Sequence, residues 1–198
     1  MNLPNRLTVM RIIMTPLFMA AMMIEAIPHN YLIALVLFIA ASLTDMLDGK
    51  IARARNLVTN FGKFLDPLAD KMLTTSAFIA FLAKGFGIGM EWVLFIVLFR
   101  EFMIASLRLV AVSSEVKKVI PANMWGKVKT VTQMAAIILG IAVMYYNDFV
   151  AEAVSAPEMV GDVLFVVFNV VLWVSTVVAV ISGVIYMKDS FEFVDPSK

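Results

Sequence analysis

The sequence has no cysteine and a single histidine, His29. The absence of cysteine excludes disulfide bonds, thiolate metal sites and a cysteine nucleophile. Any bound metal must therefore be held by oxygen atoms or by His29. The chain also has no low-complexity linker and no visible repeat. We expect residues 1–198 to form one domain.

Charge is scarce as well. Asp, Glu, Lys and Arg make up 16% of the residues, whereas 62% are hydrophobic and the mean hydropathy is +0.92. An ordinary soluble domain is nearer roughly half apolar. A helix needs about 20 residues to cross a bilayer, so 198 residues leave room for six or seven helices with short loops and for no soluble domain.

Six apolar stretches predict an all-α integral membrane bundle of six transmembrane helices. They cover about residues 7–26, 31–55, 61–83, 90–112, 128–146 and 163–187, and an acidic loop over residues 147–162 is expected between the last two. Residues 1–6 are expected to form a short interfacial segment. Reading the first stretch as a secretory signal peptide is an alternative, which its length and the five later spans disfavour. In the last span, Asn169 is expected to hydrogen-bond across the bundle.

Basic and acidic residues sort to opposite sides if the N-terminus is cytoplasmic. The basic residues on or near that side are Arg6, Arg11, Lys50, Arg53, Arg55, Lys63, Lys117, Lys118, Lys127, Lys129 and Lys188. The other side receives the acids Glu25, Glu91, Asp148, Glu152, Glu158 and Asp162, with Lys84 as its one clear cation. This pattern follows the positive-inside rule. We therefore expect a multi-pass protein of the inner (cytoplasmic) membrane with both termini in the cytoplasm.

The second and third spans carry acids where a membrane helix normally has none. Residues 72–83 offer only 12 uncharged positions before Lys84, too few to cross a hydrocarbon core of about 30 Å at about 1.5 Å per residue. The third helix must therefore begin near Phe61, which brings Asp66 and Asp70 to the membrane boundary. The second helix likewise runs through Asp45 and Asp48.

Helical periodicity places these acids on two stripes. On the second helix the positions i, i+3 and i+7 are Asp45, Asp48 and Ala52, and on the third the positions i, i+4 and i+8 are Gly62, Asp66 and Asp70. Antiparallel helices joined near residue 57 would hold the acids at matching depths. The stripes can therefore face one another.

Several readings of four acids at a membrane boundary are open. One is a solvated helix end in which the acids pair with Lys50, Arg53 and Lys63. Another is a divalent-cation transporter, although such sites lie near the bilayer midplane. A bound metal compensates the charge more fully, because carboxylate sites suit Mg²⁺, Mn²⁺ or Ca²⁺. Two such ions can clamp the attacking and leaving oxygens in phosphoryl transfer.

The pattern Asp45-x-x-Asp48-Gly49-x-x-Ala52-Arg53, followed after eight residues by Gly62-x-x-x-Asp66-x-x-x-Asp70, resembles the signature of the CDP-alcohol phosphotransferases. The resemblance implies a six-helix membrane fold, a homodimer, and an active site facing the cytoplasm. A CDP-linked donor would lose CMP while its phosphoryl-alcohol moiety passes to an acceptor hydroxyl.

The same resemblance implies roles for individual residues. Two Mg²⁺ or Mn²⁺ ions would be held by Asp45, Asp48, Asp66 and Asp70. Asp70 would also take the proton from the acceptor hydroxyl. The residues against the cytidine nucleotide would be Asp45, Gly49, Ala52, Arg53 and Gly62.

Charged residues in the second half bear on the acceptor. Arg100, Glu101 and Arg108 interrupt the fourth span, and Lys127 and Lys129 open the fifth. A charge inside a span is by default a functional candidate. The alternative is a structural ion pair between helices.

The order of these charged residues, with the opening Pro4-Asn5-x-Leu7-Thr8-x-x-Arg11, resembles the phosphatidylglycerophosphate synthases within that family. This likeness implies CDP-diacylglycerol as donor and sn-glycerol 3-phosphate as acceptor, with membrane lipids as partners and no nucleic acid. The acceptor phosphate would be held by Arg100, Arg108, Lys127 and Lys129. Synthesis of cardiolipin, phosphatidylserine or an inositol phospholipid by the same chemistry stays open.

Overall fold

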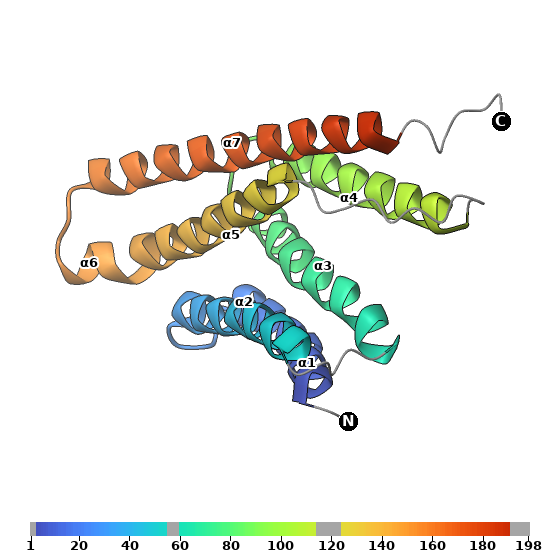
Figure 1. Cartoon of the computed structure of the whole chain (residues 1–198). Coiled ribbons are helices and arrows are strands. Elements are labelled where there is room, and N and C mark those ends of the chain that lie inside the picture. Colours follow the sequence, from blue (N-terminus) through green and yellow to red (C-terminus); the bar gives the residue numbers. More distant parts are fainter. Residues whose placement is uncertain (1–2, 55–59, 114–123, 191–198) are drawn as a thin grey trace. The chain divides into compact units, whose positions relative to one another are not determined.

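We describe the fold from a computed structural model of the chain (Figure 1). It describes residues 3–54, 60–113 and 124–190, and within these helices it leaves aside the side chains of residues 3, 4, 46–54, 60, 63, 64, 66 and 111–113. Every regular element in these ranges is a helix. The predicted all-α class is therefore confirmed.

Six long helices correspond to the six apolar stretches. They are α1 (Leu3–Met23), α2 (Asn30–Ala54), α3 (Asn60–Ala83), α4 (Met90–Ser113), α5 (Met124–Tyr145) and α7 (Glu158–Ser190). The predicted start of the third helix near Phe61 is confirmed by α3. The interfacial segment expected at the N-terminus is continuous with α1, which already begins at Leu3.

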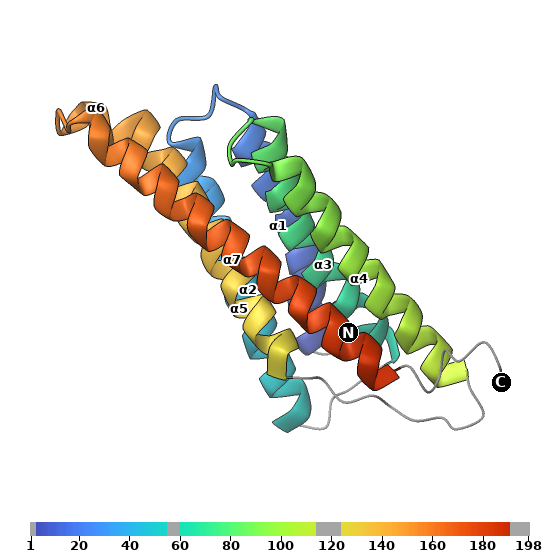
Figure 2. The ribbon, with the colours of Figure 1, turned by 90° about the horizontal axis from the view of Figure 1, so that it is seen from above.

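The connection between α5 and α7 is more helical than the acidic loop predicted from residue 147 to residue 162. A single π-helical turn, η1 (Tyr146–Val150), continues α5 and leads into the short helix α6 (Ala151–Ala153), as Figure 2 shows at the tip of this hairpin. No glycine or proline occurs between Gly140 and Pro157, so the helix can continue beyond α5. The turn between α3 and α4, in contrast, uses glycines with positive φ angles, 61° at Gly85 and 66° at Gly89.

Three stretches of the described residues are long and apolar enough to cross a membrane, judged by length and composition. They are Asn5–Met23, Met124–Ala153 and Glu158–Ser190. The described part of α2 adds a shorter apolar helix, Asn30–Asp45. Several apolar helices make this a membrane protein, and six spans remain a prediction.

The chain forms two compact units, which we describe separately. The first contains Met1–Gly87 and Ile137–Phe168, and the second contains Ile88–Ala136 and Asn169–Lys198. The first thus holds the helices with the aspartates. The second holds the cations predicted for the acceptor.

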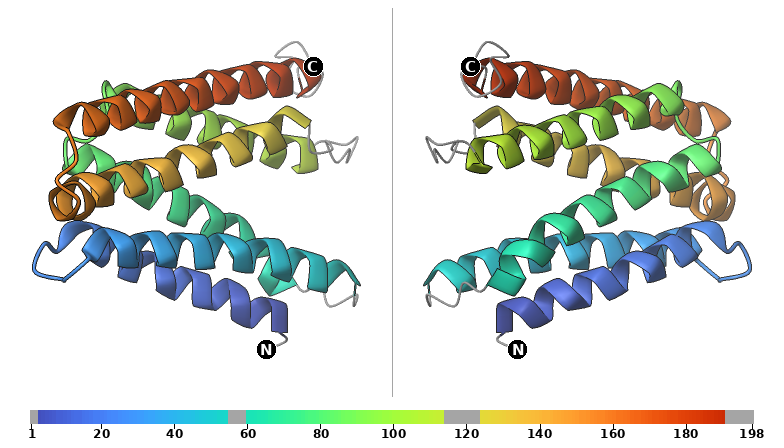
Figure 3. Two further views of the ribbon diagram at one scale, coloured as in Figure 1. Left: turned by 90° about the vertical axis from the view of Figure 1, so that its left-hand side faces the viewer. Right: turned by 90° about the vertical axis from the view of Figure 1, so that its right-hand side faces the viewer.

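In the first unit, α1 packs against both α2 and α3, whereas α2 and α3 splay apart away from their connection (Figure 3). The face of α1 that is buried in this packing is Thr8, Arg11, Thr15, Phe18 and Met22. The spacing i, i+3, i+7, i+10 and i+14 is that of a helix-packing seam. Arg11 is therefore the one charged residue among these buried positions of α1.

Where α1 and α3 end in the first unit, Lys84 binds Glu25, with 2.6 Å between Nζ and Oε1. The hydrogen bond and the charge of Lys84 lower the pKa of Glu25, and the hydrogen bond to Glu25 raises the pKa of Lys84. The Glu25 side chain is 82% exposed, so this is a surface pair of the kind that contributes little to stability.

In the second unit, α4 and the C-terminal part of α7 lie side by side. Asn169 Oδ1 accepts a hydrogen bond from the backbone N–H of Ile88 (2.6 Å), and Trp173 Nε1 donates to the Ile88 carbonyl (3.0 Å). The expected hydrogen bond of Asn169 across the bundle is thereby confirmed. These bonds tie α7 to the start of α4.

Candidate active site

The aspartates predicted for the site belong to α2 and α3. Asp45 and Asp70 have described side chains, and both are partly buried; Gly62 is buried. The remaining residues predicted for the metals and the nucleotide are Asp48, Gly49, Ala52, Arg53 and Asp66, whose side chains lie outside the described residues.

Asp45 is held by an arginine from another helix. Arg11 Nη1 lies 2.5 Å from Asp45 Oδ1, and Arg11 Nε donates to the carbonyl of Ala41 at 3.2 Å. The Arg11 side chain is 1% exposed and that of Asp45 is 37% exposed. The guanidinium thus uses two of its nitrogens to fix one aspartate relative to α1, while the carboxylate keeps access to solvent.

The local sequence explains why Asp45 points at α1. Ala34, Phe38 and Ala41 form the buried stripe of α2, and Asp45 follows Ala41 by one helical turn on the same face. The stripe that packs the helix therefore ends in the aspartate. Arg11 meets it there because its own position belongs to the buried seam of α1.

Asp70 lies on α3, one residue from the buried stripe formed by Leu65, Ala69 and Leu73. Its backbone carbonyl accepts a hydrogen bond from Thr74 Oγ1 at 3.2 Å. Thr74 thus bonds the main chain and leaves the carboxylate to other partners. A partly buried carboxylate on a packed helix has a defined position and still reaches water, as a group that moves a proton must.

The acids suit a divalent metal by their chemistry. All four predicted ligands are carboxylates, the donors that Mg²⁺ and Mn²⁺ prefer, and Asp45 has the exposure that a ligand needs. Among the side chains that the structure describes, no three acids or histidines gather closely enough to hold an ion. Two of the four predicted ligands, Asp48 and Asp66, are outside that set.

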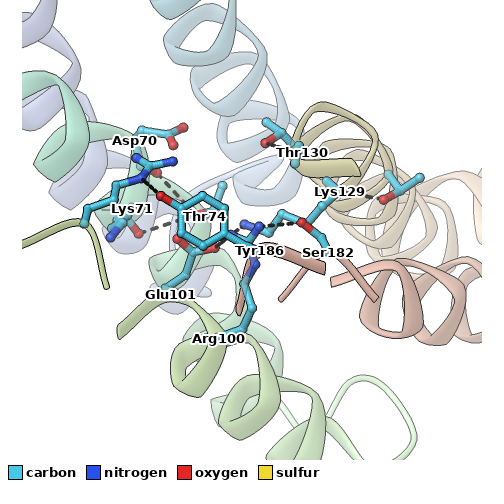
Figure 4. A network of polar contacts seen from close by, with 12 residues as sticks. Asp70, Lys71, Thr74, Arg100, Glu101, Lys129, Thr130, Ser182 and Tyr186 are labelled. Atoms are coloured by element: carbon cyan, nitrogen blue, oxygen red, sulfur yellow. Dashed lines mark hydrogen bonds and ion pairs between the residues drawn. The ribbon is translucent and has the colours of Figure 1, made fainter. Parts of the chain in front are cut away.

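The second unit contains a buried cluster of charged side chains, shown in Figure 4. Glu101 Oε1 accepts from Lys129 Nζ at 2.5 Å and from Arg100 Nη1 at 2.8 Å. Arg100 Nη2 donates to Ser182 Oγ at 2.7 Å. The cluster joins α4, α5 and α7, and the structural ion pair left open by the sequence is present here.

The other two cations predicted for the acceptor are arranged differently. Arg108 is exposed, and its Nε donates to the hydroxyl of Tyr186 at 3.3 Å while its guanidinium carbon lies 5.6 Å from the centre of that ring. Lys127 is exposed. The four predicted cations therefore form two sets, a buried pair held by Glu101 and an exposed pair near the helix ends.

Two polar residues of α7, Ser182 and Tyr186, were missed as site candidates from the sequence. They lie one turn apart on the buried face that also contains Leu172, Ser175 and Ala179. Small polar residues with this spacing in a very apolar helix were a usable signal. What the sequence did not show is which cations they contact.

A family model, "CDP-alcohol phosphatidyltransferase", matches residues 1–181. The chain belongs to this family. Among its relatives is the "CDP-diacylglycerol--glycerol-3-phosphate 3-phosphatidyltransferase" of Bacillus subtilis (strain 168), which is 38% identical over 202 residues and covers 96% of each chain.

Two further relatives carry similar names. A protein of Rickettsia bellii (strain RML369-C) with the same name as the Bacillus relative is 35% identical over 187 residues, covering 94% of each chain. The "Probable phosphatidylglycerophosphate synthase" of Mycobacterium tuberculosis (strain ATCC 25618 / H37Rv) is 35% identical over 185 residues, covering 92% of this chain and 85% of its own. The similarity thus extends over nearly the whole chain.

Proposed function

We propose that this chain transfers the phosphatidyl group of CDP-diacylglycerol to sn-glycerol 3-phosphate, giving phosphatidylglycerol phosphate and CMP. The observation that carries the proposal is the complete Asp45-to-Asp70 signature in a chain similar over nearly its whole length to proteins named for this reaction. The charged residues of α4 and α5 support an anionic acceptor, because Arg and Lys side chains are the usual partners of phosphate.

Asp70 is the group that takes the proton from the acceptor hydroxyl. The hydroxyl oxygen then attacks the phosphorus of the phosphatidyl group, and the bond from that phosphorus to the oxygen of CMP breaks. A positioned general base contributes typically about 10²–10⁴-fold to such a step. A partly buried aspartate on α3 suits this role.

Asp45, Asp48, Asp66 and Asp70 would hold two Mg²⁺ or Mn²⁺ ions, which supply charge stabilisation for the diphosphate when bound. Gly49, Ala52, Arg53 and Gly62 would line the cytidine nucleotide together with Asp45. Small residues allow close approach to the backbone, and Arg53 offers charge to phosphate. Arg11 fixes Asp45 in this set by one hydrogen bond to its carboxylate and one to the Ala41 carbonyl of the same helix.

The acceptor phosphate would be held by Arg100, Arg108, Lys127 and Lys129. The exposed Arg108 and Lys127 suit first contact with a soluble anion, and the partly buried Arg100 and the buried Lys129 suit a fixed position for its phosphate. The charge sorting of the sequence supports an inner-membrane location with both termini and the site in the cytoplasm. The family resemblance supports a homodimer.

The test is CMP release by the purified full-length protein in lipid with CDP-diacylglycerol, Mg²⁺ and a panel of acceptors. We expect sn-glycerol 3-phosphate to outperform serine, inositol phosphate and phosphatidylglycerol. The Glu91→Gln variant, which changes an exposed acid in the first turn of α4, is the control with full activity. Release of CMP with one of the other acceptors instead would contradict the assigned acceptor, and no release with any would contradict the reaction.

A further inference from the structure

We propose that Glu101 is a positioning residue for the acceptor, which acts by holding Lys129 and Arg100 at a fixed depth in the bundle. This inference rests on the proposed function, because it assigns the two cations to the acceptor phosphate. Glu101 itself is an anion and would not contact that phosphate. Its effect on the reaction would therefore pass through the cations that it binds.

One oxygen of Glu101 joins both cations. The distances from Oε1 are 2.5 Å to Lys129 Nζ and 2.8 Å to Arg100 Nη1, and the three side chains are between 10% and 16% exposed. Ion pairs that are this buried keep their geometry, because water does not compete for their partners. Arg100 is fixed from a second side by Ser182.

Helix packing leaves room for this arrangement. A Cβ atom added at Gly183 would lie 3.1 Å from Arg100 Cγ and 3.3 Å from Met103 Cε. Glycine at this position of α7 therefore allows the stem of Arg100 to pass. The arginine is enclosed between Glu101 on its own helix and the residues of α7.

Glu101 opposes the tendency of Lys129 to leave this depth. Lysine side chains in membrane helices extend along the helix so that the ammonium reaches the aqueous interface. Lys129 is the sixth residue of α5 (Met124–Tyr145), so its flexible stem could turn toward that helix start. The carboxylate of Glu101 instead draws the ammonium toward Arg100, the eleventh residue of α4 (Met90–Ser113).

The cluster has capacity left for an anion. The side chains of Arg100, Lys129 and Glu101 carry two positive charges and one negative charge. In addition, Arg100 Nε and Gln133 Nε2 are buried donors without a hydrogen-bond partner among the described residues. Gln133 is 1% exposed and lies one turn after Lys129 on α5. Such unused donors favour an oxygen-rich anion such as a phosphate.

The experiment compares Glu101→Gln, Lys129→Gln and the double variant in full-length protein. CMP release is measured against sn-glycerol 3-phosphate at saturating CDP-diacylglycerol. We expect Glu101→Gln to raise the acceptor KM about tenfold, equivalent to about 1.4 kcal/mol, with kcat and the donor KM within about twofold of wild type. Glu91→Gln is the matched control on the same helix and should change neither KM.

A double-mutant cycle separates positioning from a merely structural role. If Glu101 acts through Lys129 and Arg100, adding Glu101→Gln to Lys129→Gln should raise the acceptor KM by clearly less than the about tenfold expected for Glu101→Gln alone, because only the effect through Arg100 remains. The inference would be overturned if the two substitutions had multiplicative effects on the acceptor KM, or if Glu101→Gln left the acceptor KM unchanged. It would also be overturned if Glu101→Gln lowered kcat and Tm and raised the donor KM in parallel with the acceptor KM. If Glu101→Gln is unstable, Glu101→Asp serves in its place, because it keeps the charge on a shorter side chain. Its acceptor KM should lie between those of wild type and Glu101→Gln.

A thermal-shift titration with sn-glycerol 3-phosphate requires no turnover. We expect Glu101→Gln to need about tenfold more ligand than wild type for the same stabilisation. An unchanged titration would overturn the inference. If wild type releases no CMP but Glu101→Gln still needs about tenfold more ligand in this titration, the proposed reaction fails while the positioning role stands.

Discussion

The ion pair of Arg11 and Asp45 predicts that replacing one partner costs more stability than replacing the other, which simple charge counting does not predict. Asp45→Ala removes the carboxylate beside a guanidinium that is 1% exposed, and loss of one partner of a buried pair costs about 3–5 kcal/mol. Arg11→Gln leaves a carboxylate that is 37% exposed and can be hydrated. Its cost is mainly the lost charged hydrogen bonds, about 2 kcal/mol.

These free energies predict measurable differences in Tm. One kcal/mol corresponds to about 2–4 °C in a chain of about this size. Asp45→Ala should therefore lower Tm by about 6–20 °C, and Arg11→Gln by about 4–8 °C. The assay is thermal unfolding of the purified protein in one detergent at one pH, without added metal. Glu25→Gln, which breaks the exposed pair with Lys84, should lower Tm much less than either of these substitutions.

Replacing both partners separates stability from function. The double variant Arg11→Met and Asp45→Ala removes the buried charge together with its partner, and such replacements are often neutral or stabilising. It should recover most of the Tm lost in Asp45→Ala while CMP release remains lost. A larger fall in Tm for Arg11→Gln than for Asp45→Ala, or no recovery in the double variant, would refute the reasoning.

Four further outcomes are expected. Asp70→Asn should lower CMP release at least about 100-fold while CDP-diacylglycerol binding, measured by equilibrium dialysis, persists; unchanged turnover would exclude Asp70 as the base. Arg108→Ala and Lys127→Ala should raise the KM of the acceptor, and an effect on the lipid donor alone would mean that these cations are misassigned. Chelation by EDTA should stop CMP release and added Mg²⁺ or Mn²⁺ should restore it, whereas activity that persists after chelation would contradict the metal sites. Because Lys84 lowers the pKa of Glu25, the folded state favours the carboxylate. The small stability from this pair should be present above the ordinary glutamate pKa and be lost as pH falls through the lowered pKa. The difference in Tm between wild type and Glu25→Gln across pH measures it, and an opposite trend would contradict the pairing.

The sequence was sufficient for the helices because their ends are set locally. The 12 uncharged positions of residues 72–83 were too few for a span, which placed the start of α3 near Phe61, and Gly85 to Gly89 ended the helix. The loop predicted from residue 147 was partly wrong because acidity was taken as a sign of irregular structure. Acidic residues at a solvated helix end are compatible with a helix, and η1 and α6 continue it.

The partners of the charged residues could not be predicted in the same way. Arg11 belonged equally to the cytoplasmic cations and to the buried seam of α1, and only tertiary packing brought it to Asp45. Likewise, Arg100 and Arg108 are both arginines on α4. One pairs with Glu101 and Ser182 and the other contacts Tyr186. Such choices depend on which helices are neighbours, and helical periodicity alone does not supply that.

The central claim is the transfer of a phosphatidyl group to glycerol 3-phosphate, and following a label in the acceptor tests it most directly. The purified protein is incubated in lipid with Mg²⁺, CDP-diacylglycerol and sn-glycerol 3-[³²P]phosphate, and the organic phase is counted. We predict that label enters the lipid phase only when CDP-diacylglycerol is present, with one CMP released per label transferred. Release of CMP while the label stays in the aqueous phase would contradict the account.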